Sequence, residues 1–348
     1  MSPVRVGIIG TGWGANVQVP AFQCVDGLEL VAITSGRKER AEAVAREHNL
    51  PYAFDDYREM LRAAKPDLIS IVTPPIFHRE MTLAALEAGV HVICEKPFAM
   101  NVAEGNEMVA AAARSGLITA VDHEFRLVPA RLAMQRLLDE GAIGEPFLIR
   151  IADLTVRATD QPYGWWFDRA QGGGLFGAVG SHYIDAVHQW IGRFDRVSAR
   201  LSAVIPERAR ADGTGLERVT ADDTADLAFT LENGVAGHIS LSITARGGAR
   251  RTEIFGTAGT LILEGTKAFF TTGGPPEEVQ STLAEQGRLE DPRLGPTVEL
   301  AQRVIDRING HDSGPFATFA DGLEVQRVMD AVRLSSDEGR EVRIAEVG

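Results

Sequence analysis

A glycine-rich turn directly after an apolar run near the N-terminus constrains this chain more than any other feature of its sequence. The run Val4–Ile9 is rich in β-branched residues and nearly continuous, which is typical of a buried parallel strand. It is followed by Gly10-Thr11-Gly12-Trp13-Gly14-Ala15, which matches the pattern G-x-G-x-x-[GA]. The first glycine permits a tight turn, the second admits a pyrophosphate close to backbone amides, and the last small residue lets helix and strand pack closely. Between a strand and a helix the pattern predicts a dinucleotide-binding loop, although an ordinary strand-to-helix turn is also consistent with it.

Strand-like and helix-like patterns alternate over the first 122 residues. Such alternation predicts a doubly wound parallel sheet of the Rossmann type, in which right-handed crossovers bury both sheet faces. The expected strands are Val4–Ile9, Leu28–Thr34, Leu68–Thr73, Val90–Cys94 and Thr119–Asp122, and the expected helices are Glu39–His48, Arg79–Ala88 and Val102–Ser115.

The pattern changes after Glu124, where several alternating strands follow with few helices between the later ones. Those strands predict a second, largely antiparallel sheet, with helices at Pro129–Glu140, Thr297–Ile308 and Thr318–Ser335 and a loop over Gly273–Pro296. Because 348 residues exceed one ordinary core, we expect an α/β protein of two domains. Residues 1–122 would bind NAD(P), and residues 123–348 would bind substrate and form oligomer contacts.

Composition excludes several classes of function. The net charge of −13 and the lack of any long run of Lys and Arg argue against a nucleic-acid surface. No stretch approaches about 18 consecutive apolar residues, two cysteines make no disulfide framework, and the N-terminus does not resemble a secretory signal. No cluster of His, Cys, Asp or Glu has the spacing of a metal site. We therefore expect a cytoplasmic protein without a metal, whose ligands are small molecules.

The residues after the second strand discriminate between the two nicotinamide cofactors. An acidic side chain there would hold a free ribose 2′-hydroxyl, but the sequence reads Thr34-Ser35-Gly36-Arg37-Lys38. A hydroxyl beside Arg37 and Lys38 suits a 2′-phosphate, which favours NADP over NAD. The alternative is that Arg37 and Lys38 merely begin the next helix on its solvated face.

Polar residues also follow the third and fourth strands. Thr73-Pro74-Pro75 and His78 come after one, and Glu95-Lys96-Pro97 after the other. Ligands bind at the carboxyl ends of the strands in open α/β sheets. A half-buried lysine there suits acid/base chemistry, because burial disfavours the charged amine. A lysine that is simply solvated is also consistent with this position.

At these residues the sequence resembles the Gfo/Idh/MocA oxidoreductase family (glucose-fructose oxidoreductase, inositol dehydrogenase and relatives). The resemblance covers almost the whole chain. It rests on the glycine loop, on Thr73–His78, on the run from Ala88 to Pro97 with its Glu-Lys-Pro, and on Gly172-Gly173-Gly174 followed by Gly180–Asp185.

The resemblance implies a Rossmann domain followed by an α/β domain with a large open, mostly antiparallel sheet. It implies hydride transfer between a nicotinamide and a sugar, polyol or related alcohol or ketone. Lys96 would be the catalytic lysine, Glu95 and Pro97 would shape the nicotinamide pocket, and the Lys96–Pro97 bond would be cis. His182 would exchange a proton or orient the substrate.

One departure from the family pattern affects the proton path. Many relatives carry an Asp four residues before the histidine, where this chain has Ala178. Lys96 would then carry the proton transfer, while His182 hydrogen-bonds the substrate. Asp185 either contributes to the substrate site or is structural.

Further candidates have two open interpretations each. Tyr163, Trp165 and Trp166 precede the glycine triplet and would either stack on a sugar ring or belong to the core. Arg126 would either lie near cofactor and substrate, as the resemblance implies, or form an ion pair at the domain boundary. The expected cofactor residues are thus Gly10, Thr11, Gly12, Trp13, Gly14, Ala15, Ser35, Arg37, Lys38, Thr73, Pro74, Pro75, His78, Glu95, Lys96, Pro97 and Arg126. The expected substrate residues are Lys96, Tyr163, Trp165, Trp166, His182 and Asp185.

Two other functions are also consistent with the sequence. One is redox-assisted elimination or glycoside cleavage with a tightly held NAD, and the other is a non-catalytic cofactor-binding protein. An open sheet face in the second domain would need a cover, so we expect a homodimer or homotetramer.

Overall fold

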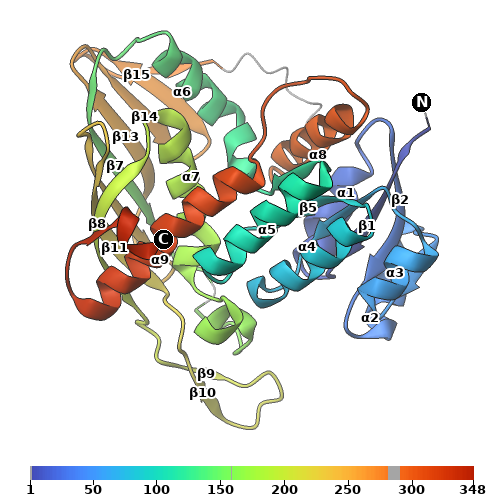
Figure 1. Cartoon of the computed structure of the whole chain (residues 1–348). Coiled ribbons are helices and arrows are strands. Elements are labelled where there is room, and N and C mark those ends of the chain that lie inside the picture. The colour runs from blue at the N-terminus through green and yellow to red at the C-terminus, as the bar shows by residue number, and fades with distance from the viewer. Residues whose placement is uncertain (1, 158, 281–290) are drawn as a thin grey trace. The chain divides into compact units, whose positions relative to one another are not determined.

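The computed structural model describes residues 2–157, 159–280 and 291–348. These residues form two compact units (Figure 1). One unit comprises residues 2–127 and 291–323, and the other comprises the described residues of 128–280 together with 324–348.

The first unit is built on a six-stranded sheet in the order β3-β2-β1-β4-β5-β6. All of its pairs are parallel, and the order reverses between β1 and β4, the switch point at which such sheets bind ligands. The strands are β1 (Val4–Ile9), β2 (Leu28–Thr34), β3 (Tyr52–Phe54), β4 (Leu68–Ile71), β5 (His91–Cys94) and β6 (Thr119–Val121).

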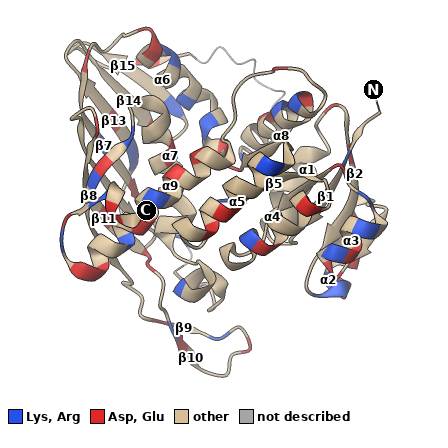
Figure 2. Cartoon of the chain, in the orientation of Figure 1, with Lys and Arg blue, Asp and Glu red and all other residues tan. Residues whose placement is uncertain are grey.

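Helices cover both faces of this sheet. They are α1 (Val19–Phe22), α2 (Lys38–His48), α3 (Tyr57–Ala63), α4 (His78–Glu87), α5 (Val102–Ser115), α8 (Leu294–Ile308) and the first turn of α9 (Phe319–Glu338). Alternate strand residues point into two apolar clusters, and α8 packs into one of them while Phe319 and Leu323 pack into the other. The outer turns of α2 and α3 carry many charged residues (Figure 2).

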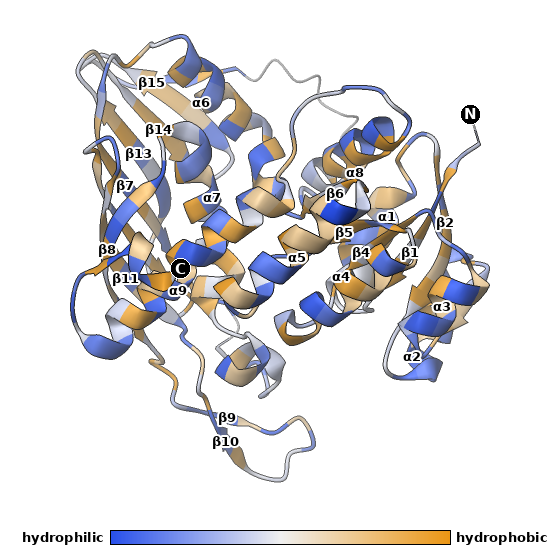
Figure 3. Cartoon of the chain, viewed as in Figure 1, coloured by the Kyte–Doolittle hydropathy of each residue, from blue (hydrophilic) through white to orange (hydrophobic). Residues whose placement is uncertain are grey.

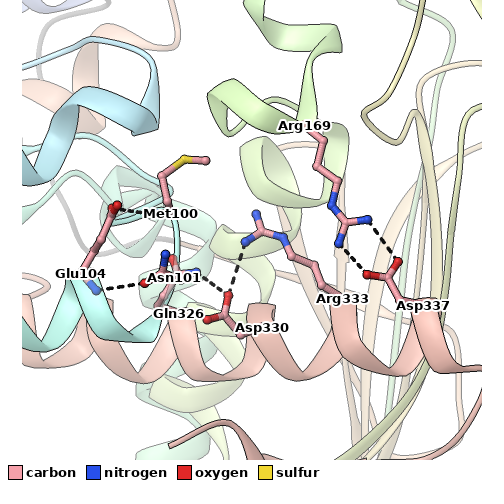
Figure 4. A network of polar contacts seen from close by, with 8 residues as sticks. All are labelled: Met100, Asn101, Glu104, Arg169, Gln326, Asp330, Arg333 and Asp337. Carbon is pink, nitrogen blue, oxygen red and sulfur yellow. Dashed lines mark hydrogen bonds and ion pairs between the residues drawn. The ribbon is translucent and has the colours of Figure 1, made fainter.

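Helix α5 shows how local sequence sets an element's limits. Asn101 Oδ1 accepts from Glu104 N at 3.0 Å, and Glu104 Oε2 accepts from Met100 N at 3.2 Å (Figure 4). The first bond satisfies a backbone donor that the first helical turn leaves without a partner, and the second ties the residue before the N-cap to that turn. The helix ends at Gly116, which adopts a φ of 66°.

The second unit is built on a nine-stranded sheet in the order β16-β15-β14-β13-β7-β12-β11-β8-β17. Only β7 and β12 pair in parallel among the described strands of this sheet. The strands are β7 (Pro146–Leu154), β8 (Phe194–Ser202), β11 (Thr224–Leu231), β12 (Ala236–Ser242), β13 (Arg250–Gly256), β14 (Thr260–Glu264), β15 (Lys267–Thr271), β16 (Glu277–Val279) and β17 (Val342–Arg343). A separate hairpin joins β9 (Glu207–Ala209) to β10 (Leu216–Arg218).

One face of this sheet packs against helices. Helix α6 (Pro129–Asp139), helix α7 (Ser181–Trp190) and the later turns of α9 share an apolar core with alternate residues of the strands. On β11, for example, Leu227 and Phe229 are buried while Ala228 is exposed. Figure 3 shows both hydrophobic and hydrophilic stretches along these strands, in keeping with burial of every second residue.

The predicted fold class is confirmed: a parallel Rossmann sheet precedes a mixed, mostly antiparallel sheet. Within the region expected to be loop, the structure has β16 and the start of α8 at Leu294, while residues 281–290 lie outside the described residues. Strand β3 and helix α3 were not expected, since each is too short to show a clear period. Among the described helices, none is both long and apolar enough to cross a membrane.

The packing of the first turn of α9 within the first unit can be tested at Phe319. Its ring lies 4.8 Å from that of Phe98, and Val121 N in β6 donates to Ala317 O just before the helix at 2.8 Å. Phe319→Ala should destabilise this unit by about 3–5 kcal/mol and speed amide exchange at Val121. Exposed Leu216→Ala is the control and should change stability by less than about 0.5 kcal/mol. Unchanged exchange in β6 of the Phe319 variant would contradict this packing.

Candidate active site

The three glycines of the N-terminal loop differ in their surroundings. Gly10 has a φ of 122°, and a Cβ there would lie 2.2 Å from Val72 O. A Cβ on Gly14 would lie 3.0 Å from Ile8 Cγ2, so the close packing of helix and strand falls on Gly14. Gly12 is exposed, and a Cβ on it would meet no atom within 4 Å, so there is room for a ligand beside its backbone. This arrangement fits a bound pyrophosphate.

The other loop residues hold this turn in place. Gly10 N donates to Thr34 O at 2.9 Å, which ties the turn to β2. Thr11 and Ala15 are buried, and the half-buried Trp13 ring lies 5.4 Å from the guanidinium of Arg293. The turn continues into a π-helical segment, Gly14–Gln18, and then into α1.

The end of β2 carries hydroxyl and basic groups. Ser35 Oγ accepts from Thr11 Oγ1 at 3.3 Å and from Arg37 N at 3.4 Å. Arg37 and Lys38 are exposed at the start of α2. Arg40, which was not among the residues predicted from the sequence, donates to Thr11 O at 3.5 Å and so brings a third cation to the glycine loop.

His78 joins the loops that follow β4 and β5. Its Nε2 lies 2.9 Å from Thr73 O, and its Nδ1 lies 3.1 Å from Pro97 O. The ring is fully buried, and burial lowers the pKa of His78. Pro75 is buried, while Thr73 and Pro74 are half-buried beside it. The two ring nitrogens of His78 therefore contact backbone carbonyls and link the loop after β4 to the loop after β5.

Lys96 follows β5 at the carboxyl edge of the sheet. The Lys96–Pro97 bond is cis, as predicted. The lysine side chain is 18% exposed, and its Nζ lies 3.9 Å from Glu95 Oε2. A mostly buried amine that retains some access is suited to exchange a proton with a bound ligand.

A buried polar network lies behind Lys96. Gln18 Nε2 donates to Glu95 Oε1 at 3.1 Å and to Asp122 Oδ2 at 2.8 Å. Ser70 Oγ donates to Gln18 Oε1 at 2.6 Å. Burial raises the pKa of Glu95 well above its ordinary value and raises that of Asp122 as well. Glu95 was predicted from the sequence, but its partners were not, because they are scattered along the chain and match no motif.

Arg126 forms an ion pair within the first unit. Its Nη2 lies 3.6 Å from Asp321 Oδ1 in α9, and its side chain is 13% exposed. Of the two interpretations of Arg126, the ion pair thus has an identified partner, Asp321.

In the second unit the glycine triplet allows tight packing of the protein on itself. A Cβ on Gly173 would lie 2.4 Å from Trp165 O, and one on Gly174 would lie 2.4 Å from Asp222 Oδ1. Gly172 and Gly174 also have φ values of 83° and 122°. The space that Gly173 and Gly174 leave is filled by the backbone around Trp165 and by Asp222.

Asp222 holds the start of the helical segment that carries His182. Its Oδ2 accepts from Phe176 N at 2.6 Å, and its carbonyl accepts from Leu175 N at 2.9 Å. Phe176 begins a π-helical segment that runs to Gly180 and continues as α7. Burial raises the pKa of Asp222 to about 6. The sequence alone does not predict this role of Asp222, because its position just before a strand shows no capping signal.

His182 and Asp185 lie one turn apart on α7, and both are buried, at 3% and 1% exposure. Ala178, half-buried on the preceding turn, carries no carboxyl group. The side chain of His182 is therefore almost completely buried.

The aromatic segment before the glycines divides into a buried and an exposed part. Trp166 packs edge-on to Phe167 at 5.1 Å and contacts the core, whereas Trp165 is 39% exposed and Tyr163 half-buried. The Arg208 guanidinium lies 3.8 Å from the Phe167 ring centre and donates to Gln161 O at 3.0 Å. Trp165 and Tyr163 are thus the rings with surface to offer a ligand.

Comparison with known proteins supports an oxidoreductase with an NAD-binding Rossmann fold. Residues 4–123 match the model of the Gfo/Idh/MocA oxidoreductase family with its NAD-binding Rossmann fold, and residues 132–262 match the model of its C-terminal domain. The chain therefore belongs to the Gfo/Idh/MocA family.

Individual relatives agree with this assignment. An uncharacterized oxidoreductase of Synechocystis sp. is 32% identical over 99% of this chain and 97% of its own length. A D-glucoside 3-dehydrogenase of Escherichia coli is 36% identical over 55% of each chain. Among solved structures, an oxidoreductase domain protein from Kribbella flavida has a TM-score of 0.90 at 29% identity, covering 99% of this chain and 100% of its own. A levoglucosan dehydrogenase in complex with NADH and L-sorbose shares the fold, with a TM-score of 0.88 at 24% identity over 98% of both chains.

Asp222 provides a pH test of this geometry. Its pKa is raised on folding, so the stabilisation present below about pH 4 is lost as the pH rises through about 6, where the folded protein must give up that proton. Asp222→Asn can still accept the Phe176 bond and removes this dependence. Denaturant unfolding should show the variant gaining about 1–3 kcal/mol relative to wild type between pH 4 and 8. Parallel stability curves would contradict the account, and exposed Asp55→Asn is the control.

Proposed function

We propose that this protein is an NAD(P)-dependent dehydrogenase or reductase that acts on a CH–OH group of a sugar, polyol or related compound. The observation that carries this proposal is Lys96, held beside a buried carboxyl pair at the carboxyl edge of the Rossmann sheet. The dehydrogenase relatives named above support a sugar-like substrate.

The residues of the first unit would hold the dinucleotide. The backbone at Gly10 and Gly12 would receive the pyrophosphate, and the residues after β4 and β5 would border the nicotinamide. When bound, the dinucleotide supplies the redox chemistry, by accepting or donating two electrons and a hydrogen at its nicotinamide ring.

The chain's own residues supply the acid/base chemistry. As the substrate alcohol is oxidised, the neutral Lys96 amine accepts the hydroxyl proton, and in the reverse direction the ammonium donates it. Because position 178 is alanine, we assign the proton transfer to Lys96 and substrate hydrogen bonding to His182. Asp185, which is 1% exposed, would support the helix around His182.

Sugar rings would stack on the aromatic side chains of the second unit. Trp165 and Tyr163 have the exposed surface for this. Trp166 packs against the core and would support the segment that carries them. Aromatic faces suit the apolar faces of sugar rings because they exclude water there.

We infer a preference for NADP over NAD from the end of β2. No carboxylate stands between Thr34 and Lys38, and the groups there are Ser35, Arg37 and Lys38, with Arg40 folded onto the glycine loop. Such a set pairs with a 2′-phosphate.

We also infer a homo-oligomer that covers the outer face of the nine-stranded sheet. Small and polar side chains line this face, among them Ala152, Ala228, Ala236, His238 and Ser240, together with charged ones such as Arg150 and Arg251. Most soluble oligomers are symmetric homo-oligomers, and in a two-fold dimer the same face of each copy meets the other. Light scattering should return a multiple of 37.5 kDa, and the mass of a single chain would contradict the inference.

Substitution of Lys96 tests the acid/base role. Lys96→Met keeps the length of the side chain and removes its proton, so turnover of a D-glucoside or anhydrosugar should fall about 10²–10⁴-fold. Exposed Lys65→Met is the matched control in the same unit. The dissociation constant of the reduced dinucleotide should stay within a few-fold. Full turnover by the Lys96 variant would contradict the assignment.

The cofactor preference depends on charge after β2. Arg37→Ala should weaken NADPH binding by roughly 10-fold or more, because a charged hydrogen bond to phosphate is worth about 1.5–3 kcal/mol. NADH binding should be unaffected by the same change. Calorimetric titration measures both, and equal losses for the two nucleotides would argue against a 2′-phosphate contact.

A further inference from the structure

Two carboxyl groups are buried side by side behind Lys96. Glu95 is 6% exposed and Asp122 is 1% exposed. Both accept a hydrogen bond from the same nitrogen, Nε2 of Gln18, at 3.1 and 2.8 Å, so they are close neighbours. Ser70 donates to the amide oxygen of Gln18 at 2.6 Å, which turns the amide nitrogen toward the two acids.

The charges around this pair do not support two ionised carboxylates. The titratable groups that face it are Lys96, Glu124 and the thiol of Cys94. Burial is the largest cause that raises the pKa of Glu95, and the charge of Asp122 raises it further, while Lys96 lowers it. Burial also keeps the Cys94 thiol protonated by raising its pKa. Adjacent buried carboxyls with one nearby ammonium retain a proton between them.

We propose that Glu95 and Asp122 share one proton and together present a single negative charge to Lys96, which sets the charge state of that lysine. This inference rests on the acid/base role proposed for Lys96. Asp122 acts through the lysine and is a positioning residue.

Gln18 connects this pair to the cofactor loop. It is the last residue of the π-helical segment that begins at Gly14, and it is fully buried. A displacement of the glycine loop therefore moves the donor on which both carboxyls depend. The proton-sharing pair and the segment that follows the dinucleotide loop are thus joined by hydrogen bonds.

The number of charges in the pair can be read from three variants. Glu95→Gln and Asp122→Asn each leave one carboxyl, and the double variant leaves none. If the pair carries one charge, each single variant keeps that charge, and the acid limb of the kcat/KM–pH profile should move by less than about half a unit. The double variant loses the charge that stabilises the ammonium, so its limb should move to lower pH by about one unit or more. Equal shifts in each single variant, adding in the double variant, would overturn the proposal.

A second measurement does not depend on turnover. Infrared spectra at neutral pH should contain the C=O stretch of a protonated carboxyl that is lost in both Glu95→Gln and Asp122→Asn, because the remaining acid ionises next to Lys96. Exposed Asp55→Asn, the control, should keep it. If wild type has no band that disappears in these variants, both acids are ionised and the pair does not share a proton. If the band is present but Lys96→Met keeps full turnover, the pair stands and the proposed function of Lys96 fails.

Discussion

The amide of Gln18 is the contact on which the first unit's candidate site depends. It joins the glycine-loop segment to the strand-end residues Glu95 and Asp122, and Ser70 fixes its orientation. These residues come from four different stretches of the chain and meet at the carboxyl edge of one parallel sheet. The sheet order brings them together, and the amide supplies the donor that two buried acids require. The glycine loop and Lys96 are therefore parts of one polar cluster.

In the second unit, too, a buried polar side chain joins segments that are far apart in sequence. Asp222 accepts the first amides of the helical segment that leads to His182, and the glycine triplet lets the chain come close enough for this bond. A buried carboxyl here replaces the local cap that the sequence before Phe176 lacks. The position of His182 thus depends on a residue 40 positions further along the chain, in the loop before β11.

Local signals in the sequence predicted the fold class and most of the strands. The apolar runs Val4–Ile9 and Leu28–Thr34 match β1 and β2, and Val102–Ser115 matches α5, because each has a clear period and punctuated ends. Gln18, Asp122 and Asp222 could not be predicted, since their roles depend on partners far away in sequence. Nothing within residues 291–323 indicates which unit they join, because an amphipathic helix shows a buried face but not the surface it covers. The glycine triplet is conspicuous in the sequence, but its packing against Trp165 and Asp222 depends on the three-dimensional structure.

The central claim is that this chain binds a nicotinamide dinucleotide at its N-terminal loop and uses it in catalysis. The most direct measurement is titration of the purified protein with NADPH and with NADH, followed by the fluorescence of the bound nucleotide. The supernatant of denatured protein would be analysed in parallel for nucleotide already held. The account predicts one saturable site per chain for at least one of the two nucleotides, or release of a tightly held nicotinamide on denaturation. Absence of both binding and release would contradict it.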